Sequence, residues 1–209
     1  GVITPTCGTP LLDERDGKSY NTVQIGTQCW MAENLNTGIR IDYSQGQSNN
    51  STIEKYCYAN LESNCDVYGG LYQWREMMQY STNPGVQGIC PSGWHLPTDE
   101  EQTILTTWLG GNSIAGGKMK ETGTGHWTSP NTGATDEAGF TMLPGGFRDY
   151  TAGIGQINER GALWSSTQNG GAGYNCSWNL DLLYNSVEVT RSGGAMWSNG
   201  FSVRCVKNQ

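Results

Sequence analysis

Seven cysteines carry the most evident chemistry of this chain, at positions 7, 29, 57, 65, 90, 176 and 205. They form no CxxC pair, and with only two histidines in the chain we expect no metal centre. The spacing favours disulfides in an oxidising compartment, with one thiol left over. The predicted pairs are Cys7–Cys29, Cys57–Cys65 and Cys90–Cys205, which leaves Cys176 free. The alternative is a cytosolic protein in which all seven thiols are reduced.

The two histidines have no evident catalytic partners. His95 lies between apolar neighbours just before a predicted helix, so we expect a buried ring that is hydrogen-bonded to the backbone. His126 stands beside Trp127 in a loop rich in Gly and Thr and is expected at the surface. Neither ring belongs to a recognisable Ser-His-Asp or Cys-His arrangement. We therefore predict that the chain is not an enzyme and needs no cofactor.

The composition changes between positions 168 and 199. This stretch holds Gly, Asn, Ser, Tyr, Trp, Cys and Met in no regular order, with only three charges, Asp181, Glu188 and Arg191. Small adaptable residues mixed with rigid aromatic ones are typical of a surface that contacts a large partner. A catalytic site needs a few fixed polar groups in defined roles instead. The stretch therefore indicates a recognition protein, and the more regular segments 161–167 and 200–206 frame it.

Bulk properties narrow the class of protein. The net charge of −7 and the absence of any Lys/Arg cluster argue against nucleic acid as a partner. No run approaches 18 apolar residues, so we expect no membrane span. The 209 residues suit one domain, and 30 glycines with eight tryptophans and ten tyrosines favour a loop-rich fold with short strands. We expect a protein that is extracellular or displayed on a surface.

Two helices are predicted. Thr98 and Glu101 form a capping box behind Pro97, and Gly110-Gly111 ends the helix that follows. Its expected buried face is formed by Ile104, Leu105, Trp108 and Leu109. A second helix is expected over 68–78 from the stripe of Leu71, Trp74 and Met78.

Strands dominate the C-terminal third, so the fold class is α+β. Segments 178–182 and 187–191 alternate with period two around a turn at 184–186, and 201–206 is expected to be one central strand. The alternation places Asp181, Glu188 and Thr190 outward. Trp197, in a Gly-flanked loop, is expected to be exposed, whereas Trp74, Trp94, Trp108 and Trp164 are expected in the core. The predicted ligand-binding residues are Tyr174, Cys176, Trp178, Asp181, Leu183, Tyr184, Ser186, Glu188, Thr190, Met196 and Trp197.

Several phrases occur in the order of a known family. They are DGKSY at 16–20, IGTQCWMAENL at 25–35, CPSGWHLPTDEE at 90–101, NTG at 131–133, DEAGF at 136–140, LPGGFR at 143–148, WSST at 164–167 and GFSVRCV at 200–206. Together they resemble the Fibrobacter succinogenes major paralogous domain over nearly the whole chain. The resemblance implies a single C-type-lectin-like domain, related to formylglycine-generating enzymes, with two helices and small antiparallel sheets. It also implies that Arg148 and Arg204 hydrogen-bond loop carbonyls or carboxylates inside the fold.

The domain is also similar to the variable proteins of diversity-generating retroelements. In those proteins a reverse transcriptase substitutes template adenines, so Asn codons scatter to Tyr, Ser, Gly, Asp, Cys and other residues in the C-terminal segment. The stretch 168–199 resembles such an outcome, with Asn remaining at 169, 175, 179, 185 and 199. The alternative is an ordinary paralog with a loop rich in Ser and Asn. The resemblance thus implies adhesion to, or recognition of, a cell-surface protein or glycan.

The chain departs from two better-known branches of this fold. The oxidase relatives use two closely spaced C-terminal cysteines, whereas Cys205 has no neighbour nearer than Cys176. Calcium-dependent lectins use Glu-Pro-Asn or Gln-Pro-Asp followed by Trp-Asn-Asp, and the chain lacks both motifs. Asp136 and Glu137 could hold a structural calcium ion, although a solvated loop is the simpler interpretation. The alternatives to a binder are an enzyme with altered chemistry and a structural surface or fibre component.

Overall fold

The computed structural model describes residues 6–170 and 175–209, and Tyr174 lies outside them. The N-terminal part contributes seven short strands: β1 (Leu11–Asp13), β2 (Lys18–Tyr20), β3 (Thr22–Ile25), β4 (Gln28–Met31), β5 (Ile39–Arg40), β6 (Glu54–Lys55) and β7 (Tyr72–Gln73). The later strands are β8 (Trp94–His95), β9 (Gly145–Arg148), β10 (Ile154–Ile157), β11 (Arg160–Gln168), β12 (Cys176–Leu183), β13 (Val189–Met196), β14 (Gly200–Phe201) and β15 (Val206–Lys207). The helices are α1 (Glu62–Tyr68), α2 (Trp74–Met77), α3 (Asp99–Trp108) and α4 (Asn112–Met119), with a 3-10 turn at Tyr58–Asn60.

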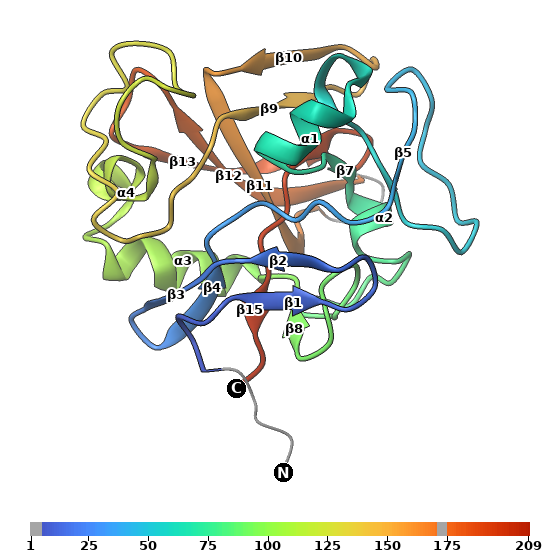
Figure 1. Cartoon of the computed structure of the whole chain (residues 1–209), viewed down its shortest axis with the longest axis horizontal. Helices are drawn as coiled ribbons and strands as arrows, with labels where there is room; N and C mark the ends of the chain where they lie inside the picture. Colours follow the sequence, from blue (N-terminus) through green and yellow to red (C-terminus); the bar gives the residue numbers. More distant parts are fainter. Residues whose placement is uncertain (1–5, 171–174) are drawn as a thin grey trace.

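The α+β class is confirmed, with larger sheets than expected. The main sheet has seven strands in the order β13-β12-β11-β9-β14-β7, with β10 beside β9, and its β11–β9 contact is parallel. A four-stranded sheet, β3-β4-β15-β8, joins the N-terminal strands to the C-terminal one. Figure 1 shows the long strands β11 to β13 above the N-terminal strands β1 to β4, with α3 and α4 on the left. Strand pairing between β4 and β15 therefore holds the N-terminal and C-terminal parts of the chain together.

The predicted helix after Thr98 forms, but its buried face is different. Thr98 and Glu101 complete the capping box, and the helix ends at Trp108, just before Leu109, Gly110 and Gly111. Trp108 is 67% exposed and Ile104 is 44% exposed, so both expectations of burial were wrong. The helix instead turns Gln102, Leu105 and Thr106 toward the core.

A buried hydrogen bond explains why α3 turns this face, and not the predicted one, toward the core. The side-chain amide of Gln102 donates to the carbonyl oxygen of Trp164 in β11 at 3.0 Å. Apolar periodicity gives no weight to a glutamine, although a bonded glutamine can be buried without a large desolvation penalty. The predicted core tryptophans Trp74, Trp94 and Trp164 are buried.

The expectation of two helices was too low, since the described residues form four. The predicted helix at 68–78 is interrupted: Tyr68 ends α1, Gly69 takes φ 80°, and only Trp74–Met77 is helical in the second half. Similarly, the strand expected at 201–206 divides into β14 and β15, which belong to different sheets. α4 was missed because its sequence contains Gly116-Gly117, which lower helix propensity.

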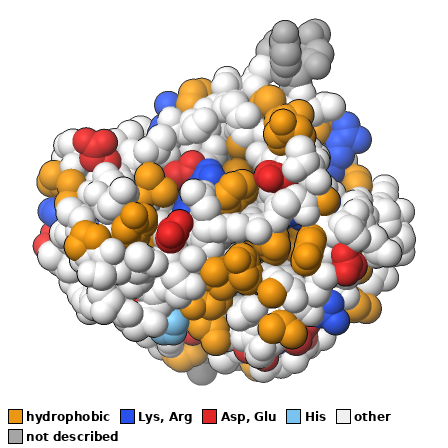
Figure 2. Space-filling model, turned by 90° about the horizontal axis from the view of Figure 1, so that it is seen from above, with side chains coloured by type: hydrophobic (Ala, Val, Ile, Leu, Met, Phe, Trp, Pro, Cys, Tyr) orange, Lys and Arg blue, Asp and Glu red, His pale blue; other side chains and the backbone are white. Residues whose placement is uncertain are grey.

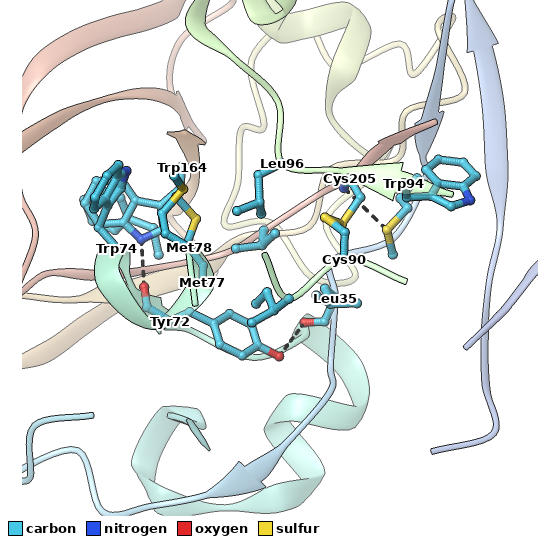
Figure 3. Close-up of a cluster of buried hydrophobic side chains, with 14 of the residues drawn as sticks. Leu35, Tyr72, Trp74, Met77, Met78, Cys90, Trp94, Leu96, Trp164 and Cys205 are labelled. Carbon is cyan, nitrogen blue, oxygen red and sulfur yellow. Dashed lines mark hydrogen bonds between the residues drawn. A yellow bond between two sulfur atoms is a disulfide. The ribbon is translucent and has the colours of Figure 1, made fainter. Parts of the chain in front are cut away.

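The core has two parts. One surrounds Trp74, Trp164 and Phe201, and Figure 3 shows it with the indole of Trp164 donating to the carbonyl of Tyr72. The other lies between the main sheet and helices α3 and α4, and includes Leu105, Leu163 and Leu182. The main sheet is therefore covered on both faces near β11, and its outer strands are the part that can face solvent.

All three predicted disulfides are confirmed. They are Cys7–Cys29, Cys57–Cys65 and Cys90–Cys205, and Cys176 is free and half-buried. Disulfides persist in oxidising environments such as the cell exterior, which fits the expected location. Within the residues that the structure describes, no helix is long and apolar enough to cross a membrane.

His95 differs from its prediction. Its ring is half-buried, but it bonds side chains rather than the backbone: Nε2 lies 2.8 Å from Oε1 of Glu101, and Nδ1 lies 2.7 Å from Oδ1 of Asn208. The ring thus links the capping box of α3 to the chain beyond β15. Arg148 and Arg204 are buried and donate to loop carbonyls, as expected.

Candidate ligand-binding surface

The antiparallel hairpin of β12 and β13 carries most of the predicted binding residues. Leu182 pairs with Val189, and both are buried against α3 and α4. Leu180 is also buried, so the inward half of the predicted alternation is confirmed. The connection between the strands is the predicted turn around Asn185. The hairpin is thus anchored by one face and can present the other.

The hairpin surface is defined here as the described residues predicted to bind. They are Cys176, Trp178, Asp181, Leu183, Tyr184, Ser186, Glu188, Thr190, Met196 and Trp197. Glu188, Thr190 and Met196 are exposed, the last at 41%. The remaining residues are half-buried, and Tyr174 lies outside the described residues. Cys176 faces Met196 across the two strands, so the free thiol borders this surface.

Asp181 is not the solvent-facing residue that alternation predicted. Its side chain is 12% exposed, and its Oδ1 accepts hydrogen bonds from Nε and Nη2 of Arg160 at 2.8 and 2.7 Å. Oδ2 accepts from the amide of Asn179 at 3.0 Å. Burial raises the pKa of the Asp181 carboxyl, while Arg160 opposes that rise. Alternation correctly placed Asp181 on the opposite face from Leu180 and Leu182, but β11 supplies an arginine that covers it.

Trp197 is also part of the framework. Its indole stacks on Trp74 with ring centroids 4.4 Å apart and an interplanar angle of 11°, and its Nε1 donates to Oγ of Ser177 at 2.7 Å. The guanidinium of Arg75 lies 5.0 Å from the ring centroid. The prediction of an exposed anchor was therefore wrong. Flanking glycines suggested a free loop, whereas α2 lies against the ring.

Trp178 belongs to a charged cluster at the edge of the sheet. The guanidinium of Arg191 lies 3.7 Å from the centroid of the Trp178 ring, within cation–π range. The same guanidinium is bidentate to Asp99, the first residue of α3. Carboxylates are favourable at a helix N-terminus, so Asp99 is stabilised from two directions. Trp178 is therefore held in one orientation and half-exposed, as rigid aromatic contact residues are.

A buried lysine fastens the turn of the hairpin. Nζ of Lys120 donates to the carbonyl oxygens of Leu183, Ser186 and Thr132 at 2.9, 2.8 and 3.0 Å. Three donors meet three acceptors, which satisfies the ammonium fully. Burial lowers the pKa of Lys120 to about 8. The backbone at positions 183–186 is thereby fixed without any use of the outward side chains.

The glycines of α4 complete that attachment. A Cβ at Gly116 would lie 2.5 Å from the carbonyl oxygen of Glu188, and the amide of Gly117 donates to the carbonyl of Val187 at 3.0 Å. Only glycine permits this approach between helix and strand backbones. Gly116 and Gly117, which made α4 hard to predict from the sequence, are thus the residues that allow the hairpin to pack closely against it.

A cleft of about 250 Å³ borders the open end of the hairpin. Its lining joins two predicted residues, Met196 and Trp197, to residues that sequence reasoning missed. These are Gln47, Gln73, Arg75 and Tyr80, while Asn175 and Ser198 belong to the predicted stretch 168–199. Arg75 is exposed, and Tyr80 donates to the buried carboxylate of Glu76 at 2.8 Å. Positions 47–80 are distant in the chain, so no local pattern could have placed them beside Met196.

On the face of the molecule seen in Figure 2, the charged groups do not gather into a patch of one sign. Basic side chains are separated there from one another by uncharged atoms. Asp136 accepts hydrogen bonds from the amide and hydroxyl of Thr141, and Glu137 pairs with Lys118 at 2.8 Å. Among the described residues, no group of three or more His, Cys, Asp or Glu is placed to hold a metal ion. The acidic residues considered for calcium thus have protein partners.

Comparison with known protein families matches residues 23–207 to the Fibrobacter succinogenes major domain. The matched range runs from Val23, the second residue of β3, to the end of β15, and so includes the hairpin surface and the frame around it. No significant match is found among curated proteins or among solved structures.

Proposed function

The chain belongs to the Fibrobacter succinogenes major domain family, and from that premise we propose that it is a recognition protein. Its C-type-lectin-like scaffold presents the hairpin surface to a partner exposed on another cell, either a protein or a glycan. The observation that carries this proposal is the separation of two roles along β12 and β13. Leu180, Leu182 and Val189 hold the hairpin, while Glu188, Thr190 and Met196 extend away from it.

That separation is what a diversified surface requires. A side chain that packs against nothing can change without loss of core burial, and such surface substitutions alter stability by less than about 0.5 kcal/mol. Backbone contacts, through Lys120 and through Gly116-Gly117, hold the turn whatever the outward side chains are. Asp181 and Trp197 are outside the variable set on this view, because each is committed to the scaffold.

The retroelement part of the proposal rests on the asparagines. Asn175 and Asn185 are exposed, which suits positions that tolerate substitution. Asn179 is 2% exposed and donates to Asp181, so selection should retain it. The proposal therefore expects variation at 175 and 185 and little at 179. Its genetic test is a near-copy of the coding segment for 168–199 beside a reverse-transcriptase gene, with differences at template adenines.

The binder proposal is also supported by the state of the cysteines. Oxidase chemistry of the related enzymes uses two closely spaced C-terminal thiols, but Cys205 is bonded to Cys90. Cys176 begins β12 as a separate free thiol. Cys205 is thus part of a disulfide and Cys176 is a separate thiol, so the two do not form the thiol pair that oxidase chemistry uses.

Charge placed on the exposed positions tests the surface directly. The triple variant Glu188→Lys/Thr190→Lys/Met196→Lys should abolish binding to partners identified on arrays of glycans and cell-surface proteins, with thermal unfolding unchanged. The matched control is Leu12→Lys/Ile39→Lys/Tyr150→Lys, three exposed positions outside the hairpin surface. It should bind like the wild type. Equal loss of binding in both triple variants would reject the hairpin as the contact surface.

A further inference from the structure

The cleft at the open end of the hairpin contains one charged side chain. Its described lining joins Met196 and Trp197 to Arg75, and every other described lining residue is uncharged. The chain as a whole has a net charge of −7, so the cleft has the opposite sign from the molecule. Its volume of about 250 Å³ lies just below the roughly 300–1,000 Å³ of sites that hold a drug-sized ligand. A cleft of this size and sign suits one small anionic group.

Arg75 is the arginine of this chain whose charge has no protein oxygen beside it. The chain has seven arginines, and in the described structure the other six form ion pairs or donate hydrogen bonds to carbonyl oxygens. The guanidinium of Arg75 makes a cation–π contact with Trp197, 5.0 Å from the ring centroid, and no hydrogen bond or ion pair with a described residue. The side chain is exposed, so its five N–H donors are open to a ligand.

The groups around Arg75 are held in place by the framework. The ring of Trp197 stacks on Trp74 and donates a hydrogen bond of its own, so the surface under the guanidinium is rigid. On another wall, the backbone amides of Gln47 and Gln73 donate to each other's side-chain oxygens at 3.0 and 2.6 Å. Because these walls are already ordered, little conformational entropy is lost when a ligand binds.

Uncommitted polar groups line the same cleft. The side chains of Asn175 and Ser198 form no hydrogen bond with a described residue. Tyr80 donates its proton to Glu76, which is buried behind it and outside the lining, so the phenol oxygen can still accept. Amide and hydroxyl groups of this kind both donate and accept, as the hydroxyls of a sugar do. Met196, which is 41% exposed, adds an apolar edge for the C–H face of a sugar ring.

We propose that this cleft binds the terminal sugar of a glycan when that sugar carries a carboxylate, as uronic and sialic acids do. The inference rests on the proposed function, since it names the part of the partner that the open end of the hairpin contacts. The planar carboxylate accepts two parallel hydrogen bonds from Arg75, a geometry that a guanidinium favours. The ring hydroxyls bond Asn175, Ser198 and Tyr80.

The anchor and its neighbours differ in their place in the chain. Arg75 lies outside the stretch 168–199, whereas Asn175 lies within it. Copies of the protein that differ at position 175 should therefore keep the carboxylate contact and change the contacts with the hydroxyls. The cleft then selects among acidic sugars without losing its preference for the acid.

Calorimetric titration of the full chain with single sugars tests the proposal. The probes are the methyl glycosides of glucuronic, galacturonic and N-acetylneuraminic acid, each also as its methyl ester, which keeps the hydroxyls and removes the charge. At least one acid should bind with a Kd below about 10 mM, and its ester should bind about tenfold more weakly. Arg75→Gln should weaken the acid by a similar factor, so that acid and ester then bind alike. Because Arg75 is exposed, thermal unfolding of this variant should be nearly unchanged.

Two further variants sharpen the test. Arg75→Lys keeps the charge without the planar fork and should recover only part of the affinity. Arg40→Gln, at another exposed arginine, is the matched control and should bind the acid like the wild type. The proposal is overturned by no binding of any of the three acids, by equal binding of acid and ester, or by wild-type affinity in Arg75→Gln. Tighter binding of N-acetylglutamate methylamide than of every acidic sugar would assign the carboxylate to a protein partner and also overturn it.

These titrations measure the cleft alone, whereas the arrays measure the whole hairpin surface. Array binding that only the hairpin triple variant abolishes, together with no response to any acidic sugar, would reject the cleft and keep the proposed function. Binding of an acidic sugar, together with equal loss of array binding in both triple variants, would reject the hairpin surface and keep the cleft.

Discussion

The indole of Trp197 lies nearly parallel to that of Trp74, with centroids 4.4 Å apart. This contact joins the end of β13 to α2 across more than a hundred residues of sequence. Trp197 also donates to Ser177 in β12. The open end of the hairpin is therefore held both by α2 and by the neighbouring strand. On the proposed function, the boundary of the variable surface therefore falls between Met196 and Trp197.

We expect Trp197→Ala to lower the free energy of unfolding by about 3 kcal/mol. That is the lower part of the range for aromatic truncation in a core, because Trp197 is half-buried. Met196→Ala, one residue earlier and exposed, should stay within about 0.5 kcal/mol. Urea denaturation of the two variants measures the difference. Similar midpoints for both would show that the stacked pair contributes little.

Lys120→Met should loosen the hairpin turn. The substitution leaves three carbonyl oxygens without their donor, and we expect a loss of about 3 kcal/mol in unfolding free energy at pH 6. Lys120 is charged at that pH, since its pKa is about 8. The control is Lys118→Met on the same helix, where Lys118 pairs with exposed Glu137. Faster amide exchange at 183–186 should accompany the Lys120 change alone.

Removal of one member of the Arg160–Asp181 pair should be worse than removal of both. Arg160→Met leaves a carboxylate that is 12% exposed without its cation, and we expect a loss of about 3 kcal/mol or more. The double variant Arg160→Met/Asp181→Leu should recover much of that stability, because apolar side chains replace both charges. Chemical denaturation of the wild type, both single variants and the double variant gives the coupling energy. A coupling near zero would mean that the pair is not a unit.

His95 should make part of the stability dependent on pH. The hydrogen bond to Glu101 raises the pKa of His95 above the ordinary 6.5. Its contribution is therefore complete below pH 6.5 and is lost as the pH rises through the folded-state pKa. The same pairing lowers the pKa of Glu101, whose contribution is lost only below its ordinary 4.5. The stability difference between wild type and His95→Gln should thus be larger at pH 5.5 than at pH 9. A difference that grows toward pH 9 would contradict this sign.

Sequence patterns correctly predicted the features that depend on interactions within a single helix or strand. The capping box at Thr98, the end of the helix at Gly110, and the inward positions Leu180 and Leu182 all follow from spacing within one element. The three disulfides were also correct. In each case the interaction partner is close in sequence or belongs to a small set of cysteines.

The failures share a different cause. Trp108 is exposed because Gln102, through a bond to β11, decides which face of α3 is buried. Asp181 is covered by Arg160, and Trp197 by Trp74, both from other elements. An alternating pattern identifies the side of a strand, but not what tertiary structure brings against it. The exposure of Glu188 and Thr190 was accordingly predicted correctly, whereas that of Asp181 and Trp197, which other elements cover, was not.

The bond between Cys90 and Cys205 joins positions that are 115 residues apart, and β12 and β13 both lie within that interval. If the molecule is pulled by its two ends, through chain that precedes Cys90 and follows Cys205, the tension passes through the sulfur–sulfur link. The intervening segment then carries none of the load and cannot be drawn out. The hairpin therefore keeps its fold under such tension, whichever side chains it exposes.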